Sequence, residues 1–250
     1  MSELPELFYD NILNQSGVVF SVTSAVGTSA DRLNDFAKTL QWEATSTAGQ
    51  QINVAGTVSI AADSWIIDNH NLSGVSIALK GSTDNFVGSD ELVDTVEPSD
   101  NDNILRHFTE ETFQYYRVSI ASTSVAAKIG ELFVGSKVQI PTNPIIPHDT
   151  DKQRDESVQS FNNWGYKFAR ERFDRKVFDL LFRGMDNEDQ YEIWKDHWKF
   201  CRGFRPFFYC FRPTTVPEDV VLVLDITGRL FCPLNGRIRS GLQKRFEEVF

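Results

Sequence analysis

The stretch YYRVSIASTSVAAKIGELFV, residues 115–134, decides the fold. It opens with Tyr115-Tyr116-Arg117-Val118-Ser119-Ile120 and closes with Lys128-Ile129-Gly130-Glu131-Leu132-Phe133-Val134, two runs rich in β-branched and aromatic residues. Apolar and polar residues alternate in the first run, which places one face of a strand on a core and the other in solvent. Small residues separate the two runs. The stretch therefore predicts two β-strands joined by a turn.

The same pattern continues toward the N-terminus, with no convincing long helix between residues 18 and 138. Further short β-type runs, separated by turn residues, are found at residues 18–22, 51–54, 58–61, 64–67 and 75–79. Many short strands with turn signals between them favour a sandwich or jelly roll. We therefore predict a mainly β protein in which residues 1–138 form a jelly-roll β-sandwich.

The second half has a different composition. Residues 139–150 contain three prolines and predict an extended linker, because proline removes backbone donors. Residues 151–250 are rich in aromatic side chains and predict a smaller α+β domain, with strand-like runs at residues 157–161, 167–182, 206–211, 220–224 and 237–250. One principal helix is expected at residues 186–202, where Trp194 and Trp198 share a stripe. We expect both tryptophans in a core, with a sugar-stacking platform as the alternative.

The acidic charge is concentrated in the first half. Residues 1–137 hold 7 Lys and Arg against 18 Asp and Glu, a net charge of −11, and residues 138–250 hold 18 against 17, a net of +1; together these give the total of −10. An acidic surface repels phosphate backbones, so nucleic-acid binding is not expected. No apolar run is long enough to predict a membrane span, and the acidic N-terminus is unlike a secretory signal.

Catalytic motifs are missing from the sequence, which contains no nucleophile elbow, no phosphate-binding glycine loop and no zinc-binding helix motif. His70 could serve as a base, but we expect it to bridge backbone groups of a turn. Cys201, Cys210 and Cys232 lack metal-ligand spacing and lie in apolar surroundings, which is typical of buried thiols. The sequence therefore predicts a non-catalytic protein.

A cation is the one ligand that the side chains suggest. Asp31, Asn34 and Asp35 offer three oxygen donors within six residues, and calcium prefers such hard oxygen ligands. These three residues are the candidate calcium ligands. No other cofactor is expected.

The order of the β-runs in residues 18–138 resembles the discoidin or galactose-binding-like sandwich. The stretches that carry this resemblance are Ala30-Asp31-Arg32-Leu33-Asn34-Asp35, Trp42-Glu43-Ala44, residues 66–84, Tyr116-Arg117-Val118-Ser119-Ile120 and Ile129-Gly130-Glu131-Leu132-Phe133-Val134-Gly135. The resemblance implies calcium at the loop with the early Asp and a ligand at loops on one end of the sandwich. The chain departs from that family because it lacks the usual terminal cysteine pair and an obvious aromatic or basic ligand set in those loops.

The whole chain resembles tail-tip and minor tail proteins of tailed bacteriophages, in which such a sandwich precedes an aromatic-rich unit. The residues behind this resemblance are Pro141-Thr142-Asn143-Pro144, the run at 173–182, the helix with Trp194 and Trp198, and Arg205-Pro206-Phe207-Phe208-Tyr209-Cys210-Phe211-Arg212-Pro213. It implies a distal-tail-like, ring-forming structural subunit of the tail tip or baseplate. Its expected interface residues are Phe173, Phe178, Phe207 and Phe208.

This resemblance also implies partners and a location. The expected partners are copies of the same chain in a homo-oligomeric ring and the tube, hub and tape-measure proteins of the tail. The expected location is the virion tail, after synthesis in the host bacterial cytoplasm. The alternative function is a carbohydrate-binding module that recognises a host cell-surface glycan through loops at residues 31–35 and 84–90. An enzyme accessory or hydrolase is the third hypothesis.

Overall fold

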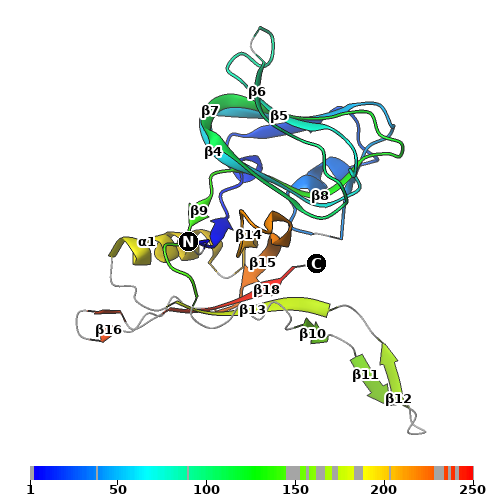
Figure 1. Cartoon of the computed structure of the whole chain (residues 1–250). Helices are drawn as coiled ribbons and strands as arrows, with labels where there is room; N and C mark the ends of the chain where they lie inside the picture. Colours follow the sequence, from blue (N-terminus) through cyan, green and yellow to red (C-terminus); the bar gives the residue numbers. More distant parts are fainter. Residues whose placement is uncertain are drawn as a thin grey trace. The chain divides into compact units, whose positions relative to one another are not determined.

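The chain forms two compact units in a computed structural model (Figure 1). The structure describes residues 3–37, 39–88, 90–144, 153–155, 158–161, 167–170, 174–182, 188–202, 204–227, 234–235, 238–239 and 242–249. Unit 1 joins residues 1–139 with residues 208–221 and Phe250, and unit 2 joins residues 140–207 with residues 222–249. Unit 1 thus takes in a segment that the sequence assigned to the C-terminal domain.

Unit 1 is a β-sandwich of seven strands with three further strands, β1, β9 and β14, paired to one another. Its strands are β1 Glu6–Phe8, β2 Val19–Val22, β3 Trp42–Glu43, β4 Gln50–His70, β5 Ile77–Ser82, β6 Glu91–Val96, β7 Ile104–Ile120, β8 Lys128–Gly135, β9 Val138–Gln139 and β14 Phe207–Cys210. Three short 3₁₀ turns complete it: η1 Ile12–Asn14, η2 Ser29–Leu33 and η3 Pro217–Asp219.

The sandwich is antiparallel throughout, in the order β3-β8-β4-β7-β5-β6, with β2 paired to β4. The long strands β4 and β7 run together along most of their length, with register shifts between Ala55 and Ile60 and between Ala62 and Ser64. The first half of β4 pairs with β2 and its second half pairs with β8, so the bent strand belongs to both layers of the sandwich. The prediction of a mainly β, jelly-roll-like sandwich is confirmed.

The core of the sandwich explains why these residues form strands. Trp42, Trp65 and Tyr116 are among its largest fully buried side chains. They come from β3, β4 and β7. Trp42 and Tyr116 each lie between less buried neighbours, as a strand with one buried face requires, whereas Trp65 lies in a stretch of β4, residues 64–68, that is buried on both faces. Gly81 of β5 leaves room for the Phe113 ring, because a Cβ at Gly81 would clash with that ring.

In unit 1 the strands β9, β1 and β14 pair as antiparallel neighbours in this order. Phe8 lies opposite Phe208, and Leu7 lies opposite Tyr209. The Phe133 ring of β8 contacts the Phe208 ring edge-on, with centroids 6.3 Å apart. The first strand of the chain is therefore paired with a segment about two hundred positions later.

Unit 2 contains a sheet and the one helix that the structure describes. Its elements are β10 Gln153–Asp155, β11 Val158–Phe161, β12 Lys167–Arg170, β13 Asp174–Phe182, α1 Glu188–Cys201, β15 Val221–Asp225, β16 Leu234–Asn235, β17 Ile238–Arg239 and β18 Leu242–Glu248. The order β10-β13-β18-β15 is antiparallel, and β11 pairs β12 as a separate hairpin.

The structure refines several sequence predictions for the second half. The run at residues 167–182 contains two strands, β12 and β13, rather than one. Gln139, predicted as the start of the linker, belongs to β9, and residues 145–150 of that linker lie outside the described residues. Among the described residues, no helix is long and apolar enough to cross a bilayer.

Candidate functional site

Three carboxylates meet at the loop where the sequence predicted calcium. Glu131 of β8 and Asp68 of β4 are cross-strand partners, and both are buried. The Asp35 side chain, from the loop that follows η2, shares a hydrogen bond with Glu131, and the Phe36 backbone N–H donates to the same carboxyl. Phe36 has a φ of 60°, a conformation that is uncommon for a residue with a side chain. The loop is thus held against β8 by one buried acid.

This arrangement makes the Glu131 carboxyl a poor acid. Burial, followed by the negative charges of Asp35 and Asp68, raises the pKa of Glu131 from 4.5 to about 9. Its Oε1 is buried and has no hydrogen-bond partner among the described residues. A cation beside these carboxylates would remove the repulsion.

The other two predicted calcium ligands are placed differently. The Asn34 amide donates to Leu13 O and to Asn14 Oδ1, at 3.3 and 2.8 Å. Asp31 lies in the first turn of η2 with an exposed side chain. Within the described ranges, no group of three or more His, Cys, Asp or Glu side chains is arranged to hold a metal ion. A calcium ion at Asp35 and Glu131 would therefore need backbone or water oxygens as well.

Sequence reasoning missed Glu131 and Asp68 as partners of Asp35. The signal was present, because Glu131 stands inside an otherwise apolar run of β8 in which seven successive residues are buried. A carboxylate at such a position needs a counter-charge or a proton. Spacing alone could not connect it to a loop about one hundred residues earlier.

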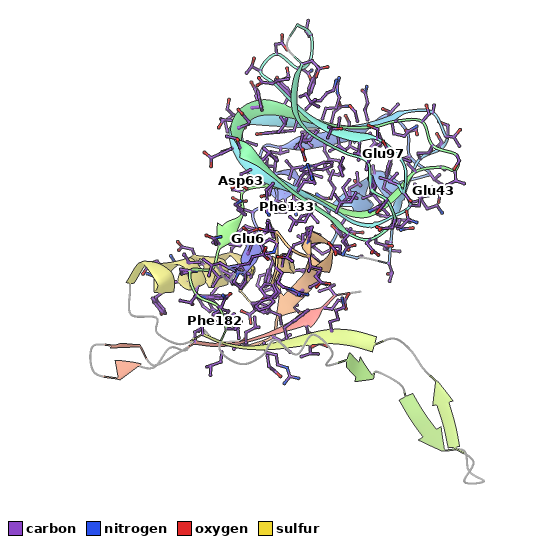
Figure 2. The ribbon with its side chains drawn as sticks, viewed as in Figure 1. Glu6, Glu43, Asp63, Glu97, Phe133 and Phe182 are labelled. Carbon is purple, nitrogen blue, oxygen red and sulfur yellow. The ribbon has the colours of Figure 1, made fainter. Side chains whose placement is uncertain are left out.

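A pocket of about 350 Å³ opens elsewhere on unit 1, at the loop between β6 and β7. It is lined by Val96, Pro98, Ser99, Asp100, Asp102, Asn103, Ile104, Leu105, Arg106, Pro217 and Glu218. Glu97, labelled in Figure 2, is the first residue of the loop between β6 and β7. Residues 217 and 218 belong to η3, so the wall combines two distant parts of the sequence.

Hydrogen bonds hold this loop in place. The Asn103 amide donates to Val220 O at 2.7 Å, and the Gly74 backbone N–H donates to Pro98 O at 2.7 Å. Ser73 adds two bonds, with its N–H donating to Asn101 Oδ1 and its hydroxyl to Ser99 O. The pocket is therefore largely preformed, as ligand sites usually are.

His70 supports the same loop and is not placed as a base. Its Nε2 lies 2.7 Å from Asp102 O, and its Nδ1 accepts from the Leu72 backbone N–H at 3.1 Å. Burial lowers the pKa of His70, which favours the neutral ring that this pattern requires. The prediction that His70 bridges backbone groups of a turn is confirmed.

Ser64, His107 and Glu6 lie close together where β1 meets the sandwich, an arrangement that the sequence did not suggest. Ser64 Oγ lies 2.9 Å from His107 Nδ1, and His107 Nε2 lies 3.1 Å from Glu6 Oε2. Ser64 is fully buried, and its hydroxyl donates to Asp63 Oδ1 at 2.7 Å. Lys137 connects the two acids, since its backbone N–H donates to Asp63 and its ammonium lies 3.9 Å from Glu6. A buried hydroxyl already engaged by a carboxylate is placed to fasten strands together.

Several aromatic residues in the described part of the second half lie inside the protein. Phe178, Phe207 and Phe208, predicted as interface residues, are all buried, and Phe173 lies outside the described residues. Their role between copies stays a prediction. Trp194 is buried as expected, but 37% of the Trp198 surface is exposed, so the expectation of a core position for Trp198 is wrong.

Comparison with known proteins finds likeness to solved structures alone. No protein-family model matches the chain, and no curated protein matches it. Among the solved structures that resemble it is CpGH89CBM32-6 of Clostridium perfringens, with 15% identity and a TM-score of 0.42 over 50% of this chain and 98% of the other.

Two further solved structures are similar to about half of the chain. Chitosan-binding module 1 of a chitosanase/glucanase from Paenibacillus sp. IK-5 has 21% identity and a TM-score of 0.43, over 50% of this chain and 97% of the other. A GH29 fucosidase of Ruminococcus gnavus has 12% identity and a TM-score of 0.45, over 53% of this chain and 28% of the other.

Proposed function

We propose that unit 1 is a non-catalytic glycan-binding module that takes its ligand in the pocket between the β6–β7 loop and η3. The observation that carries this proposal is the pocket itself, which combines hydrogen-bonding side chains such as Asp102 and Asn103 with an apolar wall that includes Ile104 and Leu105. Sugars present hydroxyl groups and apolar ring faces together, and preformed pockets of a few hundred Å³ with both kinds of lining bind such small ligands.

The calcium hypothesis belongs to the same proposal. Asp35 and Glu131 would hold the ion, and Asp68 would add negative charge behind them. When bound, calcium supplies positive charge that lets Glu131 ionise inside the protein. Asp35 and Glu131 then hold the loop after η2 against β8, so the bound ion would stabilise unit 1.

The full chain tests this function on a glycan array, with isothermal titration calorimetry on each positive ligand. We expect specific binding that is lost in Ser99→Trp, because the indole would fill the pocket. Thr83→Trp is the matched control, since Thr83 is an exposed residue in the loop between β5 and β6. A blank array, or equal glycan binding by the Ser99→Trp and wild-type proteins, would overturn the proposal.

A second function, as a self-assembling tail-tip subunit, is favoured by exposed aromatic surface in unit 2. Phe204 leaves 64% of its surface exposed and Trp198 leaves 37%. Large exposed aromatics are common at protein interfaces. Mass photometry over a range of concentrations should then show a closed ring that Trp198→Glu weakens, and a monomer at every concentration would contradict self-assembly.

A further inference from the structure

We infer that the pocket at the β6–β7 loop recognises a protonated amino group, and that its ligand is an amino sugar. This inference rests on the proposed function and specifies its ligand class. It starts from the charges of the lining residues, which are strongly unbalanced. Asp100, Asp102 and Glu218 contribute three carboxylates, and Arg106 is the only basic side chain among the lining residues.

Arg106 is already neutralised by a neighbouring acid. Its Nε and Nη2 donate to the two carboxylate oxygens of Asp94, at 3.0 and 3.1 Å. The hydrogen bond that Arg106 donates to Asp94 raises the pKa of Arg106. Asp94 is fixed in turn by the Trp65 indole, which donates to Oδ2 at 2.9 Å. Such a bidentate pair leaves the guanidinium little capacity to attract an anionic ligand.

Two of the three carboxylates remain available. Asp100 is engaged within its own loop, because it accepts from the Asp102 backbone N–H and from the Ser99 hydroxyl. Among the residues that the structure describes, the side chains of Asp102 and Glu218 have neither a hydrogen bond nor an ion pair. Both are exposed and line the pocket from opposite sequence segments. Negative potential is therefore concentrated where a ligand would enter.

The geometry favours an organic cation over a metal ion. A calcium ion needs six to eight oxygens at about 2.3–2.6 Å. No three acidic side chains of the described chain converge in that way. An ammonium group needs only one or two charge-assisted hydrogen bonds, and the remaining wall of Val96, Pro98 and Leu105 can cover the apolar face of a sugar ring.

The test compares two oligosaccharides with the same sugar backbone, one with free amines and one whose amines are acetylated and therefore uncharged. Glucosamine oligomers and fully N-acetylated oligomers of the same length are titrated into the full chain at pH 5.5, where the free amines are protonated. We expect the amine form to bind at least about tenfold more tightly, and its affinity to fall as salt rises. The variants Asp102→Asn and Glu218→Gln should each weaken binding of the amine form by about tenfold.

Glu110→Gln is the control variant, because it removes one exposed acidic charge of β7 outside the pocket. It should leave binding of the amine form unchanged. Equal weakening by Glu110→Gln and Asp102→Asn would show that overall charge, and no site, attracts the ligand, and would overturn the inference.

The remaining outcomes separate this inference from the proposed function. Equal binding of the acetylated oligomer, lost in Ser99→Trp, would leave the glycan function standing and overturn amine recognition. Oligolysine that competes at equal affinity and depends on Asp102 would overturn the sugar assignment in favour of a basic peptide. No binding of any oligosaccharide in these titrations or on the array would overturn both.

Discussion

Glu131 is the residue in which the cost of burying an acid is clearest. Its pKa of about 9 lies far above the ordinary value of 4.5, so the folded protein holds a proton at Glu131 that the unfolded chain releases. For a carboxyl with a raised folded pKa, stability is fully present below pH 4.5 and is lost as pH rises toward 9. A bound calcium ion would reverse this loss, because it stabilises the ionised form.

Glu131→Gln should therefore make unit 1 more stable at pH 8 in the presence of a chelator. Glutamine removes the ionisation but keeps a polar group of similar size beside Asp35. Differential scanning calorimetry at pH 5 and pH 8 measures the effect. Each kcal/mol of added stability should raise Tm by about 2–4 °C.

Calcium supplies the second part of this test. It should raise the Tm of the wild-type protein at pH 8 and leave Glu131→Gln unchanged. A wild-type protein that is as stable as the variant at pH 8 in chelator would contradict the raised pKa. An equal calcium response in both proteins would place the ion elsewhere.

At the scale of elements, β15, β18 and α1 are held together around a buried ion pair. The Lys244 ammonium of β18 donates to Asp225 Oδ2 of β15 at 2.5 Å, and Lys244 is fully buried. Burial alone would raise the pKa of Asp225, but the Lys244 charge holds this pKa below its ordinary value. His197 of α1 packs edge-on against Phe207, with centroids 4.4 Å apart, and burial with the Lys244 charge lowers the pKa of His197 to about 3.

Lys244→Met should destabilise unit 2 by about 3–5 kcal/mol, because it leaves the Asp225 carboxylate buried without its partner. The double variant Lys244→Met with Asp225→Asn should recover much of this loss, since no charge is then left unpaired. Denaturant unfolding of the three proteins measures the difference. A double variant as unstable as the single one would show that the charge pair is not the cause.

The same pair and His197 make unit 2 sensitive to acid. Below pH 6.5 the unfolded chain protonates His197 while the folded unit keeps it neutral until about pH 3, so stability falls as pH falls through this window. The depressed pKa of Asp225 acts in the same direction at lower pH. Glu131 in unit 1 has the opposite pH dependence.

At the scale of the whole molecule, the two units are not two successive halves of the sequence, because the chain returns to unit 1 after it has entered unit 2. Unit 1 is completed by residues 208–221, which supply most of β14 and all of η3. In a fragment of residues 1–139, β1 would lose β14 as a partner and Phe133 would lose its contact with the Phe208 ring. An unpaired strand edge beside exposed aromatic surface promotes aggregation.

We expect the 1–139 fragment to be less stable than unit 1 in the full chain and to aggregate at micromolar concentration. Static light scattering and thermal unfolding measure both properties. A synthetic peptide of residues 205–221 should restore solubility, whereas a peptide of the same composition in scrambled order should not. A fragment that is monomeric and as stable as unit 1 would show that β14 is dispensable.

Local patterns were enough to predict most of the strands and the helix. The runs at residues 115–120 and 128–134 appear within β7 and β8, and the expected helix at 186–202 contains α1 Glu188–Cys201. These predictions succeed because alternation and helical periodicity depend only on residues that are close together in the sequence. Trp198 was wrongly expected in a core, because a shared stripe with Trp194 does not show how much of that stripe other elements cover.

The candidate sites depended on contacts that no local pattern contains. Asp35 was predicted as a ligand, but its companions Glu131 and Asp68 come from β8 and β4. The pocket joins Asp102 to Glu218 across more than one hundred residues.

The amino-acid sequence by itself determined the β class of the first half, the amphipathic helix of the second half and the acidic charge of residues 1–137, because each is a property of neighbouring residues or of composition. Only the tertiary structure decided which carboxylates share a cavity, which are buried together and which strand β1 pairs with. The physical reason is that Coulomb repulsion, desolvation and strand pairing act over a few ångströms in space, whatever the separation of the residues along the chain.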